Sequence, residues 1–289
     1  MKKSLLALAV LACLCSCADN GATITNTEDS KYCIAYGDAA MTVDAAFGGR
    51  ILSFTLGSRE VISQFKMPNA FGSTFWTSPQ KEWNWPPVKE YDSLPYEASV
   101  EGGSLLLKGG VSRFGYSVGK KFSVDPKDGA FVVEYTIYNE SGEVRSVAPW
   151  EITRVPSDGE VFFDAPVSGI TPEGLMDFKE ECGLSWYSFD EAEQNRKVNA
   201  DGKGWLAYAN GGLLLVKKFP DLAPSEPAPG EAEVQVYVNR GHNYTELESQ
   251  GAYVELKDGE SVSYTVRWYL LPVEESASRE ALAAKVKEI

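Results

Sequence analysis

Residues 261–271, SVSYTVRWYLL, alternate between polar and apolar side chains. The apolar positions are Val262, Tyr264, Val266, Trp268 and Leu270. Successive side chains of a β-strand point to opposite faces, so this pattern predicts an antiparallel strand with one buried face. Asp258-Gly259 separates it from an earlier strand-like segment, residues 244–256, and an Asp-Gly turn between two such segments predicts a β-hairpin.

Short apolar runs of the same kind recur along the chain. They cover residues 51–56, 104–108, 131–138, 205–209, 213–217 and 234–238. Turn-forming pairs lie between them, and Asn210-Gly211 is the clearest hairpin signal. The pattern predicts an all-β fold, a large antiparallel β-sandwich, with a short C-terminal helix capped by Ser278.

The first residues have the features of an export signal. Lys2 and Lys3 precede a short apolar run, and residues 14–17, LCSC, resemble a bacterial lipobox with Cys17 as the lipidated residue. We expect a signal peptide over residues 1–16, a flexible lipidated tether over 17–30 and one sandwich domain over 31–289. An ordinary cleaved signal that leaves a soluble protein is the alternative.

The chain is acidic, with a formal net charge of −14 at pH 7. Loss of Lys2 and Lys3 with the signal would take this charge to −16. Such a charge argues against nucleic-acid partners and favours a neutral or cationic ligand. We expect a monomer in the cell envelope that is exported as a lipoprotein and attached to the membrane only through its lipid, on the periplasmic side or at the outer membrane.

Two cysteines, Cys33 and Cys182, remain after the signal is removed. Export would permit a disulfide between them, and two buried thiols are an equally acceptable interpretation. The sequence contains no zinc-spaced His/Cys cluster, nucleotide-binding glycine loop or Gly-x-Ser-x-Gly motif. No metal or cofactor is therefore expected.

Several segments resemble galactose mutarotases (aldose 1-epimerases). They are Leu247-Glu248-Ser249-Gln250 followed by the strand and Asp258-Gly259-Glu260, the small-residue turn at residues 47–53, and Asn139-Glu140-Ser141-Gly142 after an alternating strand. The resemblance implies the mutarotase-like sandwich fold and assigns Glu248 as the catalytic base. The tryptophan-rich segment at residues 75–87 departs from the usual family pattern and resembles a secreted branch of such proteins.

The family's proton donor is a histidine, and the corresponding segment here, Pro149-Trp150-Glu151-Ile152, contains none. Glu151 could replace it if burial kept the carboxyl protonated, and His242, the single histidine, could act from a nearby loop. Glu151 and Glu248 could alternatively form a glycosidase pair. Glu246 would share a strand face with Glu248 and is a second candidate base.

The tryptophan-rich segment is the candidate ligand site. Indole rings stack on the apolar faces of sugars, and amide or guanidinium groups bind the hydroxyls. The candidate ligand-binding residues are Arg50, Trp76, Gln80, Trp83, Asn84 and Trp85. The alternative is that some of these rings only close the end of the sandwich.

Taken together, these features predict an envelope lipoprotein that binds a carbohydrate and is non-catalytic or weakly catalytic. The alternatives are a sugar epimerase or other glycan-active enzyme that uses Glu248 with Glu151 or His242, and a structural lipoprotein.

Overall fold

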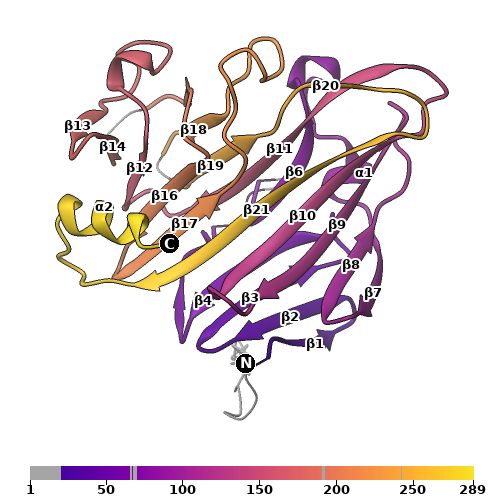
Figure 1. Ribbon diagram of the computed structural model, residues 1–289, viewed down its shortest axis with the longest axis horizontal. Coiled ribbons are helices and arrows are strands. Elements are labelled where there is room, and N and C mark those ends of the chain that lie inside the picture. The colour runs from indigo at the N-terminus through magenta and orange to yellow at the C-terminus, as the bar shows by residue number, and fades with distance from the viewer. Residues whose placement is uncertain (1–20, 66, 68–69, 191–192, 242) are drawn as a thin grey trace, which may run out of the picture.

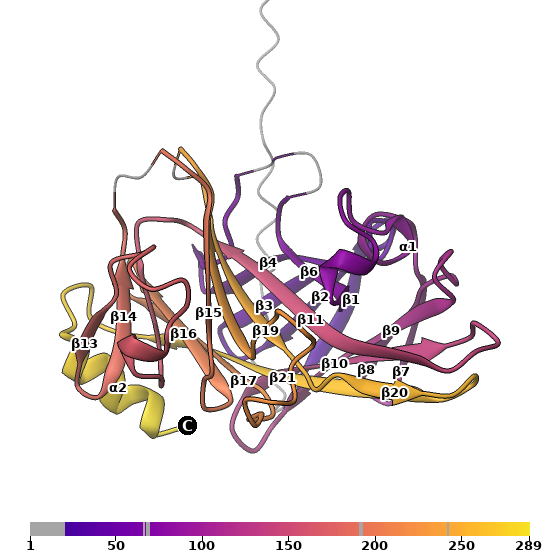
Figure 2. The ribbon, with the colours of Figure 1, turned by 90° about the horizontal axis from the view of Figure 1, so that it is seen from above.

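Two large antiparallel sheets pack face to face in the computed structural model, which describes residues 21–65, 67, 70–190, 193–241 and 243–289 (Figures 1 and 2). The prediction of an all-β sandwich with a short C-terminal helix is confirmed. The residues predicted to form the signal peptide, together with Cys17 and His242, lie outside the described residues.

The first sheet contains 11 strands among the described residues. Their spatial order is β1 (Thr23–Glu28), β2 (Lys31–Tyr36), β3 (Ala39–Asp44), β4 (Arg50–Leu56), β6 (Ser73–Ser78), β11 (Arg145–Val155), β19 (Thr245–Gln250), β18 (Val234–Val238) and β15 (Arg196–Ala200). Two short strands complete it: β5 (Arg59–Glu60) pairs with β4, and β20 (Val254–Leu256) pairs with β11.

The second sheet contains ten strands in the described part of the chain. Their order is β13 (Lys179–Glu181), β14 (Leu184–Ser188), β12 (Glu160–Phe163), β16 (Trp205–Asn210), β17 (Leu213–Lys218), β21 (Ser261–Pro272), β10 (Ala130–Asn139), β9 (Tyr116–Asp125), β8 (Ser104–Lys108) and β7 (Glu97–Glu101). The short helices are η1 (Gln80–Glu82), α1 (Lys89–Asp92), η2 (Val167–Gly169) and α2 (Arg279–Lys287).

Several local predictions agree with the structure. Tyr264, Val266 and Trp268 of β21 are buried, as their alternation required. The Asn210-Gly211 pair connects β16 to β17 in an antiparallel hairpin. Ser278 caps α2 by accepting a hydrogen bond from the Ala281 backbone N–H, and α2 packs against the outer side of the second sheet (Figure 1).

The predicted hairpin at Asp258-Gly259 is wrong. Gly259 has the positive φ of +81° that the turn requires, but the strands on either side belong to different sheets. β20 pairs with the beginning of β11, while β21 lies between β17 and β10. β11 is long enough to pair with β19 and β20 in succession, so the chain passes between the sheets at this turn.

The predicted tether is also shorter than expected. Its residues 23–28 form β1, which pairs antiparallel with β2 at the edge of the first sheet. An edge strand is held by backbone hydrogen bonds to one neighbour and need not bury apolar side chains. The polar segment TITNTE can therefore form a strand at this position.

A buried ion pair connects the two sheets. Lys217 of β17 contacts Glu151 of β11, and both side chains are fully buried. The same ammonium donates to the Thr153 hydroxyl at 2.8 Å, and the Ser73 hydroxyl donates to Glu151 at 2.6 Å. Burying two charges is tolerated only when each charge has partners of this kind.

We expect Lys217→Met to lower the free energy of unfolding by about 3–5 kcal/mol, because Glu151 would remain as an uncompensated buried charge. Urea unfolding followed by circular dichroism measures this change. The matched control is Lys179→Met, which breaks an exposed pair with Asp177 and should cost at most about 1 kcal/mol. Equal losses of unfolding free energy in Lys217→Met and Lys179→Met would contradict the stabilising role of the buried pair. In a double variant that also carries Glu151→Leu, much of the lost stability should return, because no charge is then left buried without a partner.

Candidate functional site

One face of the first sheet gathers polar and indole side chains from four neighbouring strands, β6, β11, β19 and β18. In the strand register Trp150 lies opposite Gln250 and Trp76, and Glu248 lies opposite Gln235. Residues opposite one another share a face, so all five side chains project to the same side. This is the side away from the second sheet, where α1 also lies (Figure 2).

Glu248 is the central charged residue of this face, and its side chain is only 1% exposed. Its Oε2 atom accepts hydrogen bonds from the Trp150 indole at 2.7 Å and from the Lys197 ammonium at 2.8 Å. Lys197 also lies 4.5 Å from the centre of the Trp150 ring and is 31% exposed. Among the described residues no donor bonds to Oε1 of Glu248, so this oxygen can accept a hydrogen bond from a ligand.

A second ion pair lies beside the first. The Nε atom of Arg154 is 2.8 Å from Oε1 of Glu246, and the Arg154 guanidinium lies 5.8 Å from the ring centres of Trp76 and Tyr244. Burial raises the pKa of the Glu246 carboxyl, and the Arg154 charge opposes that rise. Glu246 and Glu248 share a face, as their two-residue spacing predicted.

A hydrogen-bonded row of amides extends the site. The Nε2 atoms of Gln235 and Gln250 donate to Oε2 of Glu231 at 3.0 and 3.1 Å. Gln250 also donates to Gln235, and Gln235 donates to Asn199. Because an ionised carboxylate only accepts hydrogen bonds, Glu231 fixes the orientation of both amides.

The predicted tryptophan cluster forms next to this row. Trp76 and Trp83 are buried, with ring centres 5.6 Å apart, and Trp76 lies 5.3 Å from Trp150. Trp85 lies 6.3 Å from Trp76 and is 60% exposed. Two of the predicted rings therefore build the floor of the site, and Trp85 is the ring that remains available for stacking.

The other predicted ligand-binding residues have different surroundings. Arg50 is completely buried: it pairs with Asp92 at 2.9 Å and donates to the Phe71 backbone oxygen, so it supports the loop instead of facing a ligand. The backbone N–H of Gln80 lies 3.3 Å from Glu231, and its side chain is half-buried. Asn84 is exposed in a turn with a φ of +58°.

Glu151 does not lie with Glu248. Glu151 is opposite Ser249 in the register, one position out of step with Glu248, and its carboxylate points between the sheets to Lys217. Two predictions need Glu151 on the same face as Glu248: its use as the proton donor and the glycosidase pair of the two carboxylates. The structure places them on opposite faces, so neither prediction fits it. Side chains one residue apart on a strand point to opposite faces.

Lys197 and Arg154 were missed by the sequence analysis. Residues 196–200, RKVNA, alternate in burial along β15, so a strand signal was present. The sequence could not show that β15 pairs with β18, which brings Lys197 to a carboxylate 51 residues away.

Two buried cations support the wall of the site. Arg50 holds the end of α1 through Asp92, whose carboxylate also accepts the Trp76 indole N–H at 2.9 Å. Lys120 of β9 donates to the backbone oxygens of Gly48 and Gly49 at 2.6 and 3.1 Å. Burial, and to a lesser extent the nearby Arg50 charge, lower the pKa of Lys120 to about 7.

Within the described residues, no group of three or more His, Cys, Asp or Glu side chains could hold a metal ion. No helix in the same part of the chain is long and apolar enough to cross a membrane. Cys33 is buried in β2 of the first sheet, and Cys182 is exposed in the turn after β13 of the second sheet. No disulfide joins these two cysteines, and only one of them is buried.

Neither a family model nor a curated protein matches the sequence. The structure, however, is similar to solved structures with the galactose mutarotase-like fold. A protein from Escherichia coli K12 assigned as an aldose 1-epimerase superposes with a TM-score of 0.57 at 14% identity, over 88% of this chain and 100% of that chain. A galactose mutarotase-like protein from Clostridium acetobutylicum gives 0.55 at 10%, over 88% and 100%. A galactose mutarotase-like protein from Lactobacillus casei gives 0.52 at 10%, over 86% and 100%.

The expected superfamily resemblance is thus confirmed at the level of the fold. The chain has a β-sandwich fold similar to that of galactose mutarotase-like proteins.

Lys120 should make stability depend on pH. An unfolded lysine titrates near 10.5, so between about pH 7 and about pH 10 the unfolded chain binds a proton that the folded chain releases. Stability from this group therefore increases with pH through that window, by up to about 1.4 kcal/mol per pH unit. We expect the difference in unfolding free energy between wild type and Lys120→Met to grow from pH 7 to pH 9 in urea titrations. Lys121→Met, which alters the exposed neighbour, should show no such trend, and a constant difference for Lys120→Met would refute the assignment.

Proposed function

We propose that this protein binds a carbohydrate on the outer face of the first sheet, at Glu248. The observation that carries the proposal is the arrangement of Glu248 itself: Oε2 is held by Trp150 and Lys197, and Oε1 has no protein donor among the described residues. A buried carboxylate oriented by two donors is a preorganised acceptor for a hydroxyl group. The mutarotase-like fold supports a sugar as the ligand.

The composition of the face supports the same ligand class. Trp85 offers an exposed ring to the apolar side of a sugar, while Glu248 can accept from a hydroxyl and Lys197 can donate to one. The carboxylates of Glu231, Glu246 and Glu248 outnumber the cations Arg154 and Lys197 by one. This charge favours a neutral or cationic sugar over an anionic one.

Binding should depend on Glu248 and on the Trp85 ring. A screen of the mature domain on an array of mono- and oligosaccharides identifies the ligand, and calorimetry and tryptophan fluorescence then measure its affinity. We expect Glu248→Gln to weaken binding by about 1.5–3 kcal/mol, as for a hydrogen bond to a charged group. Trp85→Ala should cost about 1 kcal/mol, whereas Trp85→Phe, which keeps a ring, should bind nearly as well as wild type.

A folded Glu248→Gln variant with wild-type affinity for every sugar detected on the array would show that this face is not the site. Trp205→Phe, on the other sheet, is the control for changes in indole fluorescence that are unrelated to binding.

Opening of an aldose ring is the second candidate function, and Lys197 is the observation that favours it. Ring opening needs a base for the anomeric hydroxyl and an acid for the ring oxygen. Oε1 of Glu248 would take the hydroxyl proton as the bond between C1 and the ring oxygen breaks. The Lys197 ammonium would give a proton to the ring oxygen, and closure on the other face of the aldehyde would reverse both transfers. Lys197 thereby takes the role that was predicted for Glu151 or His242.

Polarimetry on freshly dissolved glucose and galactose separates the two functions. We expect sugar binding without a strong acceleration at neutral pH, because Lys197 already donates to Glu248 and is not held on the opposite side of the ligand. A strong acceleration that is lost in both Glu248→Gln and Lys197→Met would instead establish a mutarotase with an ammonium acid. An acceleration that survives Lys197→Met would exclude Lys197 as that acid.

We also propose that the protein is an exported lipoprotein of the cell envelope, monomeric and attached through Cys17. The lipobox-like residues 14–17 support this proposal. Recovery of a Cys17→Ser variant in the membrane fraction at the wild-type level would rule it out.

A further inference from the structure

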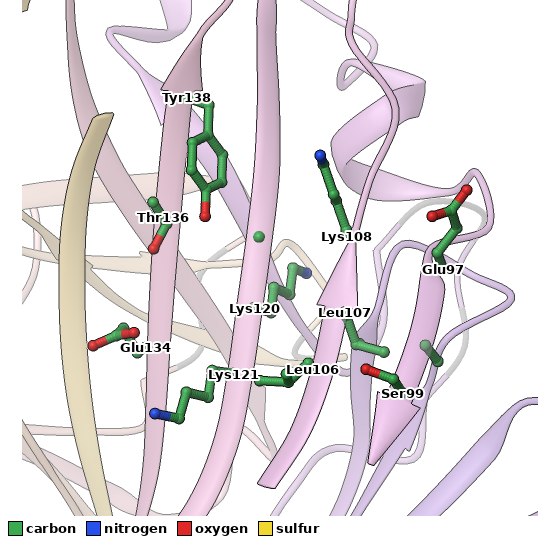
Figure 3. Close-up of a pocket in the computed structure, with 12 residues that line it drawn as sticks. Glu97, Ser99, Leu106, Leu107, Lys108, Lys120, Lys121, Glu134, Thr136 and Tyr138 are labelled. Carbon is green, nitrogen blue, oxygen red and sulfur yellow. The ribbon is translucent and has the colours of Figure 1, made fainter. Parts of the chain in front are cut away.

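A hollow lies on the second sheet, separate from the face around Glu248. It is a groove of about 450 Å³ over β7, β8, β9 and β10 (Figure 3). The side chains that define it are Glu97, Ser99, Leu106, Lys108, Lys121, Glu134, Thr136 and Tyr138. These residues point away from the first sheet, because Phe122, Val133 and Tyr135 of the same strands are buried in the core.

Gly119 leaves a gap in the row of side chains that the continuous strand β9 presents on this face. A Cβ atom at this position would lie 3.2 Å from Cε2 of Tyr138, so the Tyr138 ring occupies the space beside a missing side chain. Tyr138 is nevertheless 38% exposed. Figure 3 shows its ring along one side of the hollow, with the hydroxyl directed toward the middle strand. A planar aromatic face is thereby presented over a floor of backbone.

Two pairs of opposite charges flank this floor. Lys121 lies opposite Glu134 in the register of β9 and β10, and Lys108 lies opposite Glu97 in β7 and β8. Among the described residues, none of these four side chains makes a hydrogen bond or an ion pair. The Thr136 hydroxyl forms a 2.9 Å hydrogen bond with Ser263 of the adjacent β21 and adds a polar rim.

We propose that this groove is a second carbohydrate site that binds a neutral oligosaccharide chain. A hydroxyl group both donates and accepts, so adjacent sugar hydroxyls can donate to a carboxylate and accept from an ammonium at the same time. The Lys121–Glu134 and Lys108–Glu97 pairs present that combination at both ends of the groove, and Tyr138 provides a stacking ring along one side of it (Figure 3).

The length and the charge of the groove favour an uncharged ligand that is longer than one sugar ring. Neighbouring strands lie about 4.8 Å apart, so the three steps from β7 to β10 span about 14 Å, which exceeds a single sugar ring. The two lysines and two glutamates cancel, so no net field attracts an anionic or cationic polymer. The groove is open, and polar and apolar surfaces line it together, which fits a glycan chain that remains partly hydrated.

The test uses a panel of neutral hexasaccharides, namely cello-, xylo-, malto- and laminari-oligosaccharides, with calorimetry on the mature domain. We expect at least one of them to bind, with Tyr138→Ala weakening binding about tenfold and Gly119→Leu, which fills the groove, abolishing it. The Lys127→Ala variant, which alters an exposed lysine outside the groove, is the matched control and should bind as wild type. Glu248→Gln should leave this binding intact, which separates the groove from the site proposed above.

Failure of all four oligosaccharides to bind would overturn the proposal. Wild-type affinity in Tyr138→Ala, or loss of binding in Glu248→Gln with Tyr138→Ala unaffected, would overturn it as well. If Gly119→Leu does not fold, Tyr138→Ala carries the test, because Tyr138 is exposed and its removal leaves the core unchanged.

Discussion

Strand β11 is buried on both faces, and the rest of the structure depends on that constraint. Its side chains alternate between the space separating the two sheets and the outer face of the first sheet. Glu151 and Thr153 point inward to Lys217, whereas Trp150 and Arg154 point outward to Glu248 and Glu246. One strand therefore fixes the packing of the sandwich and the geometry of the candidate site together, and a shift of one residue in its register would exchange the two sets.

The same constraint explains which parts of the structure could be predicted from the sequence. The strand β21 has one face that is more exposed than the other and is recognisable from its alternation, whereas the β16–β17 hairpin is recognisable from its Asn210-Gly211 turn. In β11 the stretch from Val147 to Val155 is buried throughout, so no alternation is visible and the sequence does not tell which of Trp150 and Glu151 points away from the second sheet. The resemblance implies a role for Glu248, and only the strand pairing shows that Glu248 and Glu151 lie on opposite faces of the sheet.

The two cations of the candidate site, Lys197 and Arg154, could not be predicted from the sequence because their partners come from strands that are distant along the chain. The contact between Lys197 and Glu248 joins β15 to β19 across the intervening β18. The pair between Arg154 and Glu246 joins β11 to β19. Neither is visible as a spacing along the chain. In contrast, the tryptophan-rich segment was recognisable as a unit because its rings lie within ten residues of one another, although the division into floor residues and the exposed Trp85 depends on the packing of η1 and α1.

The edge strand β1 limits the reach of the lipid attachment proposed at Cys17. Because the fold begins at Thr23, only a few residues separate it from Cys17. Six residue steps span at most about 20 Å even when fully extended. A lipid on Cys17 would hold the sandwich against the bilayer surface, with little freedom to reorient. Glycans would then be sampled in the thin layer next to the membrane, and soluble chains would have to diffuse into that layer before either sheet could contact them.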